Sequence, residues 1–125
     1  MNKLKISQVQ FNGSHIPNLN SKILETNFKR AIKFKPDLIC TPECSNIITK
    51  DKKYLQLHAP YQNQCPVLKM AKNFAKKNKV NINLGSLLLK IKNKSKLVNR
   101  SFFIDDNGAI KKTYDKHMFD VKINN

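Results

Sequence analysis

The sequence predicts an α/β fold built on a single sheet. Short apolar or alternating segments typical of strands are separated by two longer segments whose apolar residues recur every three or four positions. Strands are expected near residues 3–11, 37–41, 80–90, 97–104 and 109–115, and helices near 18–34 and 66–80. A sheet must bury its apolar face against another layer, so both helices are expected on one face, with the other face exposed.

The first strand and helix are marked by a change of period. The segment KLKISQVQF (3–11) alternates polar and apolar residues, which suits a strand with one buried face. From residue 18 or 20 to 34 the apolar positions follow helical spacing, and Asn20 or Ser21 suits the N-cap. Pro36 ends this helix, after which DLIC is expected to form a short buried strand that TPE breaks.

The second half repeats the alternation and then changes it. Residues 46–64 show no clear period, which predicts an irregular segment or a short helix. PVLKMAKNFAKKNKV then reads as a helix with Pro66 in its first turn. Two apolar segments follow, and the turn DNG leads into a final strand, so the chain is expected to end in a hairpin. No repeat or linker divides the 125 residues, which predicts one domain.

The formal charge of +16 raises the question of nucleic-acid binding. Only Arg30 and Arg100 are arginines among the 24 basic residues, although arginine is the favoured side chain for phosphate and base contacts. The lysines are spread along the whole chain together with many Asn and Ile, as A/T-rich codon usage produces. We therefore expect no specific nucleic-acid partner.

Compartment and metal content follow from the cysteines, the histidines and the N-terminus. The three cysteines include no C-x-x-C pair, so reduced thiols are expected without a disulfide framework or a zinc site. The three histidines, at positions 15, 58 and 117, lack metal-ligand spacing. The sequence shows no signal peptide or transmembrane run, which predicts a cytoplasmic protein without a membrane partner.

Five motifs in fixed order carry a family resemblance. KISQVQFN, PDLICTPE, NINLGSLLLK, NRSFFIDDNGAIKKTYDK and FDV extend over nearly the whole chain. In this order they resemble the N-terminal half of the carbon-nitrogen hydrolase (nitrilase) superfamily, and within it the amidase branch that acts on ω-amides and related small carboxamides. The resemblance implies an α-β-β-α sandwich, of which residues 1–125 would form a partial domain.

The resemblance also implies a catalytic constellation of Glu, Lys and Cys. The glutamate of the family's PE motif, a general base, corresponds to Glu43, and the lysine of its Y-x-K motif, which stabilises the oxyanion, corresponds to Lys116. Such groups suit a reaction in which a deprotonated thiol attacks an amide or nitrile carbon. The complete form would release ammonia from a small amide through a thioester, without metal or cofactor, and a homo-oligomer is expected.

The family's nucleophile has no counterpart within these residues. Cys44 adjoins Glu43, and on an extended backbone neighbouring side chains point to opposite sides, so Glu43 is not expected to serve that thiol. In the family the nucleophilic cysteine and a second glutamate follow the lysine motif at positions beyond Asn125. The chain is therefore expected to be a truncated or split hydrolase that is inactive alone, with Cys40 and Cys65 as packing residues.

The lysine motif departs from the family pattern by one residue. The family has Y-x-K-x-H-x-F-D, whereas His117 follows Lys116 directly in YDKHMFD. A one-residue loss along a strand moves the following side chains to the other face. Either Lys116 keeps its place and His117, Phe119 and Asp120 are displaced, or the lysine itself is out of register.

Two other functions remain open at this point. The chain could be a non-enzymatic basic binding module, or one subunit of a hydrolase completed by a separately encoded half. Without the surrounding motifs, Glu43 would be read as a solvated loop residue or a cap, and Lys116 as a solubilising lysine.

Overall fold

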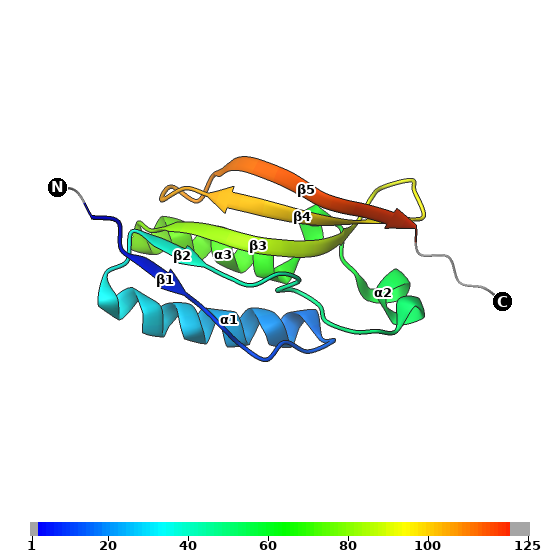
Figure 1. Ribbon diagram of the computed structural model, residues 1–125, viewed down its shortest axis with the longest axis horizontal. Coiled ribbons are helices and arrows are strands. Elements are labelled where there is room, and N and C mark those ends of the chain that lie inside the picture. The colour runs from blue at the N-terminus through cyan, green and yellow to red at the C-terminus, as the bar shows by residue number, and fades with distance from the viewer. Residues whose placement is uncertain (1–2, 121–125) are drawn as a thin grey trace.

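The structure, a computed structural model, describes the backbone of residues 3–120 and the side chains of residues 3–116. Its elements follow the predicted alternation of strands and helices (Figure 1). In chain order they are β1 (Ile6–Gln8), α1 (Pro17–Ala31), the 3₁₀ helix η1 (Ile32–Phe34), β2 (Leu38–Cys40), α2 (Lys52–His58), the 3₁₀ helix η2 (Gln62–Gln64), α3 (Pro66–Asn78), β3 (Asn81–Lys90), β4 (Lys96–Ile104) and β5 (Ile110–Asp120).

The five strands form one sheet in the order β1-β2-β3-β4-β5. Strands β1, β2 and β3 are parallel, and β3, β4 and β5 are antiparallel. This confirms the predicted single sheet and its terminal hairpin. The strands β1 and β2 are shorter than predicted, because only three residues of each pair with a neighbour. Strand β5 continues to Asp120, beyond the predicted residue 115.

Helix α1 starts earlier than the sequence predicts. Its N-cap is Ile16, and Pro17 occupies the first turn, where a fixed φ favours helix initiation. The prediction of Asn20 or Ser21 as N-cap is therefore wrong. Asn20 is fully buried inside the helix, and its side chain bonds to Ser14 and to Asn46. Helix α3 begins at Pro66 as predicted.

Both long helices pack on one face of the sheet, as predicted. A single apolar cluster joins Leu24 and Phe28 of α1 to α3 and to the inward residues of the sheet. Its members on the strands alternate along each strand, which places them on one face. They are Ile39, Ile82, Leu84, Leu87, Leu89, Val98, Phe102 and Ile104. Figure 1 shows α3 behind β3, with α1 running beside it.

The opposite face of the sheet, here called the open face, is only partly covered. A small second cluster, in which Ile47, Leu55 and Ala59 pack on Leu88 and Leu97, covers one end. This cluster comes from the segment without clear period, which contains α2. Elsewhere the open face presents residues that alternate with the core positions, including Ile6 at 48% and Tyr114 at 68% exposure. None of the helices within residues 3–120 is long and apolar enough to cross a bilayer.

Candidate active site

Glu43 lies in a turn directly after β2, where the chain packs along the middle of β3. A Cβ at position 85 would overlap the backbone carbonyl oxygens of Thr41 and Pro42. Only glycine therefore permits this close approach of the turn to β3. Gly85 was not singled out in the sequence, although a glycine inside a strand is a signal of close backbone contact.

A set of hydrogen bonds fixes the turn on β3. The Thr41 N–H donates to the Asn83 carbonyl oxygen at 3.0 Å, and the Ser45 N–H donates to that of Ser86, also at 3.0 Å. The Cys44 N–H donates to the Ser86 hydroxyl at 2.8 Å. The turn is therefore held at both ends and at its middle, which suits a rigid support for a functional side chain.

Asn46 anchors the far end of the turn. Its side-chain amide donates to the Leu88 carbonyl oxygen at 2.8 Å, and its amide oxygen accepts from the Leu88 N–H at 2.9 Å. The Asn46 carbonyl oxygen accepts a bond from Asn20 of α1 at 2.9 Å. Both asparagines are fully buried, and these bonds satisfy the backbone groups of Leu88 that face the turn.

The Glu43 side chain is exposed but held by one neighbour. Its Oε1 accepts a hydrogen bond from Asn99 Nδ2 on β4, at 2.7 Å. Asn99 is only 8% exposed. Its own Oδ1 is buried and has no hydrogen-bond partner among the described residues. Asn99 was not predicted as a site residue. The available signal was that three consecutive polar residues, Asn99, Arg100 and Ser101, interrupt the apolar strand segment LVNRSFF.

Lys116 lies at a bulge in β5. Asn99 pairs with His117 and Arg100 pairs with Asp115, so Lys116 is the extra residue between these two pairs. The Lys116 side chain is exposed. This bulge lies where the sequence departs from the family pattern by one residue. The side chains of His117, Phe119 and Asp120, predicted to be displaced, lie outside the described side chains.

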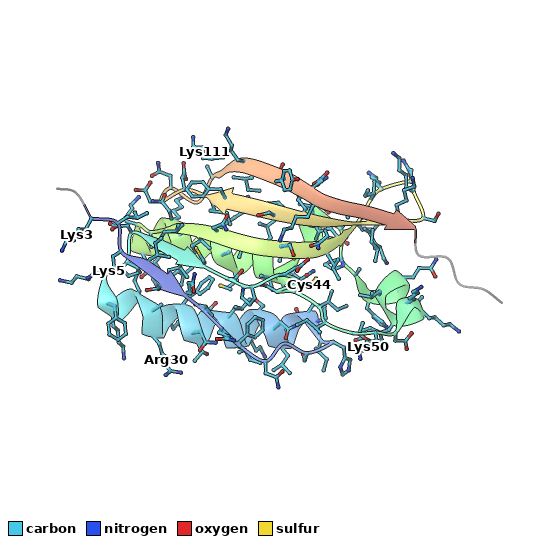
Figure 2. All side chains as sticks on the ribbon, viewed as in Figure 1. Lys3, Lys5, Arg30, Cys44, Lys50 and Lys111 are labelled. Carbon is cyan, nitrogen blue, oxygen red and sulfur yellow. The ribbon has the colours of Figure 1, made fainter. Side chains whose placement is uncertain are left out.

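Cys44 is near both charged groups. The residue has φ of 54°, in the left-handed region, so the extended backbone assumed in the sequence analysis is wrong. Its half-buried side chain packs on the small apolar cluster of the open face, and Figure 2 shows Cys44 on the segment that follows β2. Burial, and then the charge of Glu43, raise the pKa of the Cys44 thiol, whereas the Ser86 hydroxyl and the charge of Lys116 lower it. Glu43 and Lys116 therefore act electrostatically on one and the same group.

The remaining thiols do not resemble activated nucleophiles. Burial raises the pKa of both Cys40 and Cys65. A raised pKa keeps a thiol protonated at neutral pH, so neither environment favours the thiolate. No group of three His, Cys, Asp or Glu side chains within the described part of the chain is arranged to hold a metal ion.

A large hollow lies away from Glu43. It has a volume of about 910 Å³ and is bordered by η2, α3 and the β3–β4 turn. Its lining includes Arg100, whose guanidinium bonds to Asp115 on β5 and to Gln62. The hydrogen bond between Arg100 and Asp115 lowers the pKa of this carboxyl group. Arg100 alternates with Asn99 along β4, so this ion pair lies on the face opposite Glu43.

Residues 10–124 match the family described as carbon-nitrogen hydrolase. No curated protein sequence matches significantly.

Two solved structures illustrate the structural likeness. An amidase from Nesterenkonia sp. AN1 is 15% identical with a TM-score of 0.76, and the match covers 91% of this chain and 44% of the amidase. Nit3 of Saccharomyces cerevisiae, a member of branch 10 of the nitrilase superfamily, is 21% identical with a TM-score of 0.77, covering 90% and 44% respectively. The chain thus spans less than half the length of these proteins and has the fold of their matched part.

Proposed function

Because this chain belongs to the carbon-nitrogen hydrolase family, we propose that it supplies the general base and the oxyanion-stabilising lysine of an enzyme that hydrolyses a small carboxamide or nitrile. The base is Glu43 and the lysine is Lys116. The observation that carries this proposal is the placement of Glu43. It lies on a rigid turn at the end of β2, bonded to Asn99, in a fold that is the N-terminal half of a nitrilase-like sandwich.

In the proposed reaction of a carboxamide, Glu43 transfers the proton and Lys116 supplies a stabilising positive charge. Glu43 accepts the proton of a cysteine thiol while the sulfur attacks the amide carbon. The Lys116 ammonium stabilises the negative oxygen of the tetrahedral intermediate. Glu43 then returns the proton to the nitrogen, the C–N bond breaks, and ammonia leaves a thioester. Water cleaves the thioester to the carboxylic acid and restores the thiol.

We propose that the nucleophilic cysteine comes from outside these 125 residues, either further along a longer chain or on a second chain. Each of the three cysteines present has its pKa raised by burial, which disfavours the attacking thiolate. The open face, whose apolar side chains are partly exposed, suits the packing of a second half-sandwich. The complete form would act in the cytoplasm on a small amide and assemble as a homo-oligomer.

Ammonia release tests the proposal. The chain alone should release no ammonia from small carboxamides above background. When the chain is joined to a cysteine-bearing C-terminal half from a family member, the joined protein should release ammonia. In that protein Glu43→Gln should lower the rate of ammonia release by at least about 100-fold, as loss of a general base does. Glu25→Gln is a matched control, because Glu25 is a carboxylate on α1 that pairs with Lys29.

Two results would contradict the proposal. An active joined protein that is insensitive to Glu43→Gln would remove Glu43 from the chemistry. Ammonia release by the chain alone, abolished by Glu43→Gln, would require a nucleophile among Cys40, Cys44 and Cys65.

A non-enzymatic binding module is the second candidate, and the large hollow favours it. Four lysines and Arg100 contribute to its lining, with no carboxylate among the lining residues. Binding of a polyanion that is lost with Lys69→Ala and Lys72→Ala, but unaffected by Glu43→Gln, would support this candidate.

A further inference from the structure

We propose that Asn99 is the positioning residue of Glu43, holding one carboxylate oxygen so that the other is left to exchange the proton. The bond from Asn99 Nδ2 to Glu43 Oε1 is 2.7 Å long and joins residues 56 positions apart in sequence. It is the contact that connects the turn after β2 with the central part of β4. The role of this bond in catalysis rests on the proposed function, whereas the existence of the bond does not.

The environments of the two partners differ in a way that suits this role. Glu43 is exposed, and an unrestrained exposed glutamate samples several rotamers. Asn99 is almost fully buried and follows two residues of β4 that belong to the apolar clusters, Leu97 and Val98. A fixed donor thus holds an otherwise mobile carboxylate. A hydrogen bond to an ionised acceptor is stronger than a neutral one, so one bond suffices to orient the group.

Asn99 differs from the asparagine that serves only structure. Both polar groups of the Asn46 side chain bond to the backbone of Leu88. In Asn99, Nδ2 donates a hydrogen bond to Glu43, whereas Oδ1 is buried without a partner among the described residues. A buried acceptor without a partner costs free energy, and such exceptions call for a functional explanation. Packing alone would favour an apolar residue here, so the amide is explained by Glu43.

The position of Asn99 also links Glu43 to the strand that carries the lysine. Asn99 lies on β4 at the edge of the β5 bulge, where its direct partner is His117 and the extra residue is Lys116. Directly paired residues of an antiparallel ladder lie within about 5.5 Å between Cα atoms. Asn99 is thus the residue of β4 that contacts the base while lying beside the bulge of Lys116. Its neutral amide can hold the carboxylate without adding a charge between the two.

The test follows the side-chain amide protons of Asn99 by NMR between about pH 3 and pH 8, in a ¹⁵N-labelled chain that carries His117→Gln, because His117 pairs with Asn99 and a histidine ionises in this range. They should shift in a single step as the Glu43 carboxylate ionises, and Glu43→Gln should abolish the step. Glu43 is exposed, so this substitution should not affect folding. Asp115 is bonded to Arg100 on the other face, and burial raises the pKa of the Cys44 thiol. The amide protons of Asn46, bonded to the Leu88 backbone, are the matched control and should not move.

The outcomes separate this inference from the proposed function. Asn99 protons that stay constant across the pH range, or a step that persists in Glu43→Gln, would overturn the positioning role whatever the enzyme does. A step that depends on Glu43 supports the bond even if no carboxamide is hydrolysed. In that case only the ammonia assay decides whether Glu43 is the base.

Discussion

The two faces of the sheet differ in what they bury and in what they carry. Phe102 and Phe103 are neighbours on β4, yet Phe102 is fully buried beneath the helices and Phe103 is only half-buried on the open face. The helix-covered face forms a continuous apolar core. Glu43 and Asn99 meet on the open face. One face therefore stabilises the fold, whereas the other carries polar side chains beside apolar surface that remains partly exposed.

The largest expected effect contrasts the two neighbouring phenylalanines. Phe102→Ala should lower the free energy of unfolding by about 3–5 kcal/mol, because it removes a fully buried ring and leaves a cavity. Phe103→Ala should cost less than about 1 kcal/mol, because its ring lies on the open face. Denaturant titration of both variants followed by circular dichroism measures the difference. Equal losses would show that the open face is as closely packed as the core.

A smaller contrast concerns the two asparagines. Asn46→Leu should cost about 2–4 kcal/mol, because it leaves the N–H and the carbonyl oxygen of Leu88 buried without their partners. Asn99→Leu should change stability by no more than about 1 kcal/mol, because it also removes a buried oxygen that has no partner among the described residues, and because the acceptor Glu43 is exposed to water. The same denaturant titration compares them. A loss for Asn99→Leu as large as for Asn46→Leu would mean that Asn99 serves the fold.

The smallest expected effect is on the pKa of the Cys44 thiol, which reports the charges of Glu43 and Lys116. Glu43→Gln should lower the pKa of the Cys44 thiol and Lys116→Met should raise it, because the charge of Glu43 raises this pKa and the charge of Lys116 lowers it. The pH dependence of Cys44 alkylation, resolved by mass spectrometry, measures both shifts. Lys112→Met, four residues earlier on β5, is the matched control. An unchanged pKa in Lys116→Met would place this ammonium away from the site.

Much of the fold was predictable because periodicity is a local property. Helical spacing located α1 and α3, and alternation located the long strands, since each pattern reflects which side chains face the core. The start of α1 was misplaced because Asn20, which resembles an N-cap, is bound instead to Ser14 and Asn46. A capping side chain can be recognised in sequence, but whether it finds its partner in the first turn or elsewhere depends on contacts between distant segments.

The candidate site was predictable only in part, for the same reason. The motif around Glu43 indicated a carboxylate after a buried strand, which is where the structure has it. The bond from Asn99 was missed because no local pattern links residues so far apart in sequence. The bulge at Lys116 was not predicted either. It depends on how β5 pairs with β4, and strand register is decided by the partner strand.

The sequence by itself thus determined the α/β class, the order of the elements and the resemblance that singled out Glu43 and Lys116. Only the tertiary structure decided which residue holds Glu43 and on which face this contact lies. It also decided that Cys44 adopts a left-handed conformation in which its N–H donates a hydrogen bond to the Ser86 hydroxyl. The physical reason is that hydrophobic periodicity is a property of single segments. Hydrogen bonds between a turn and a strand form only after the sheet has brought distant segments together.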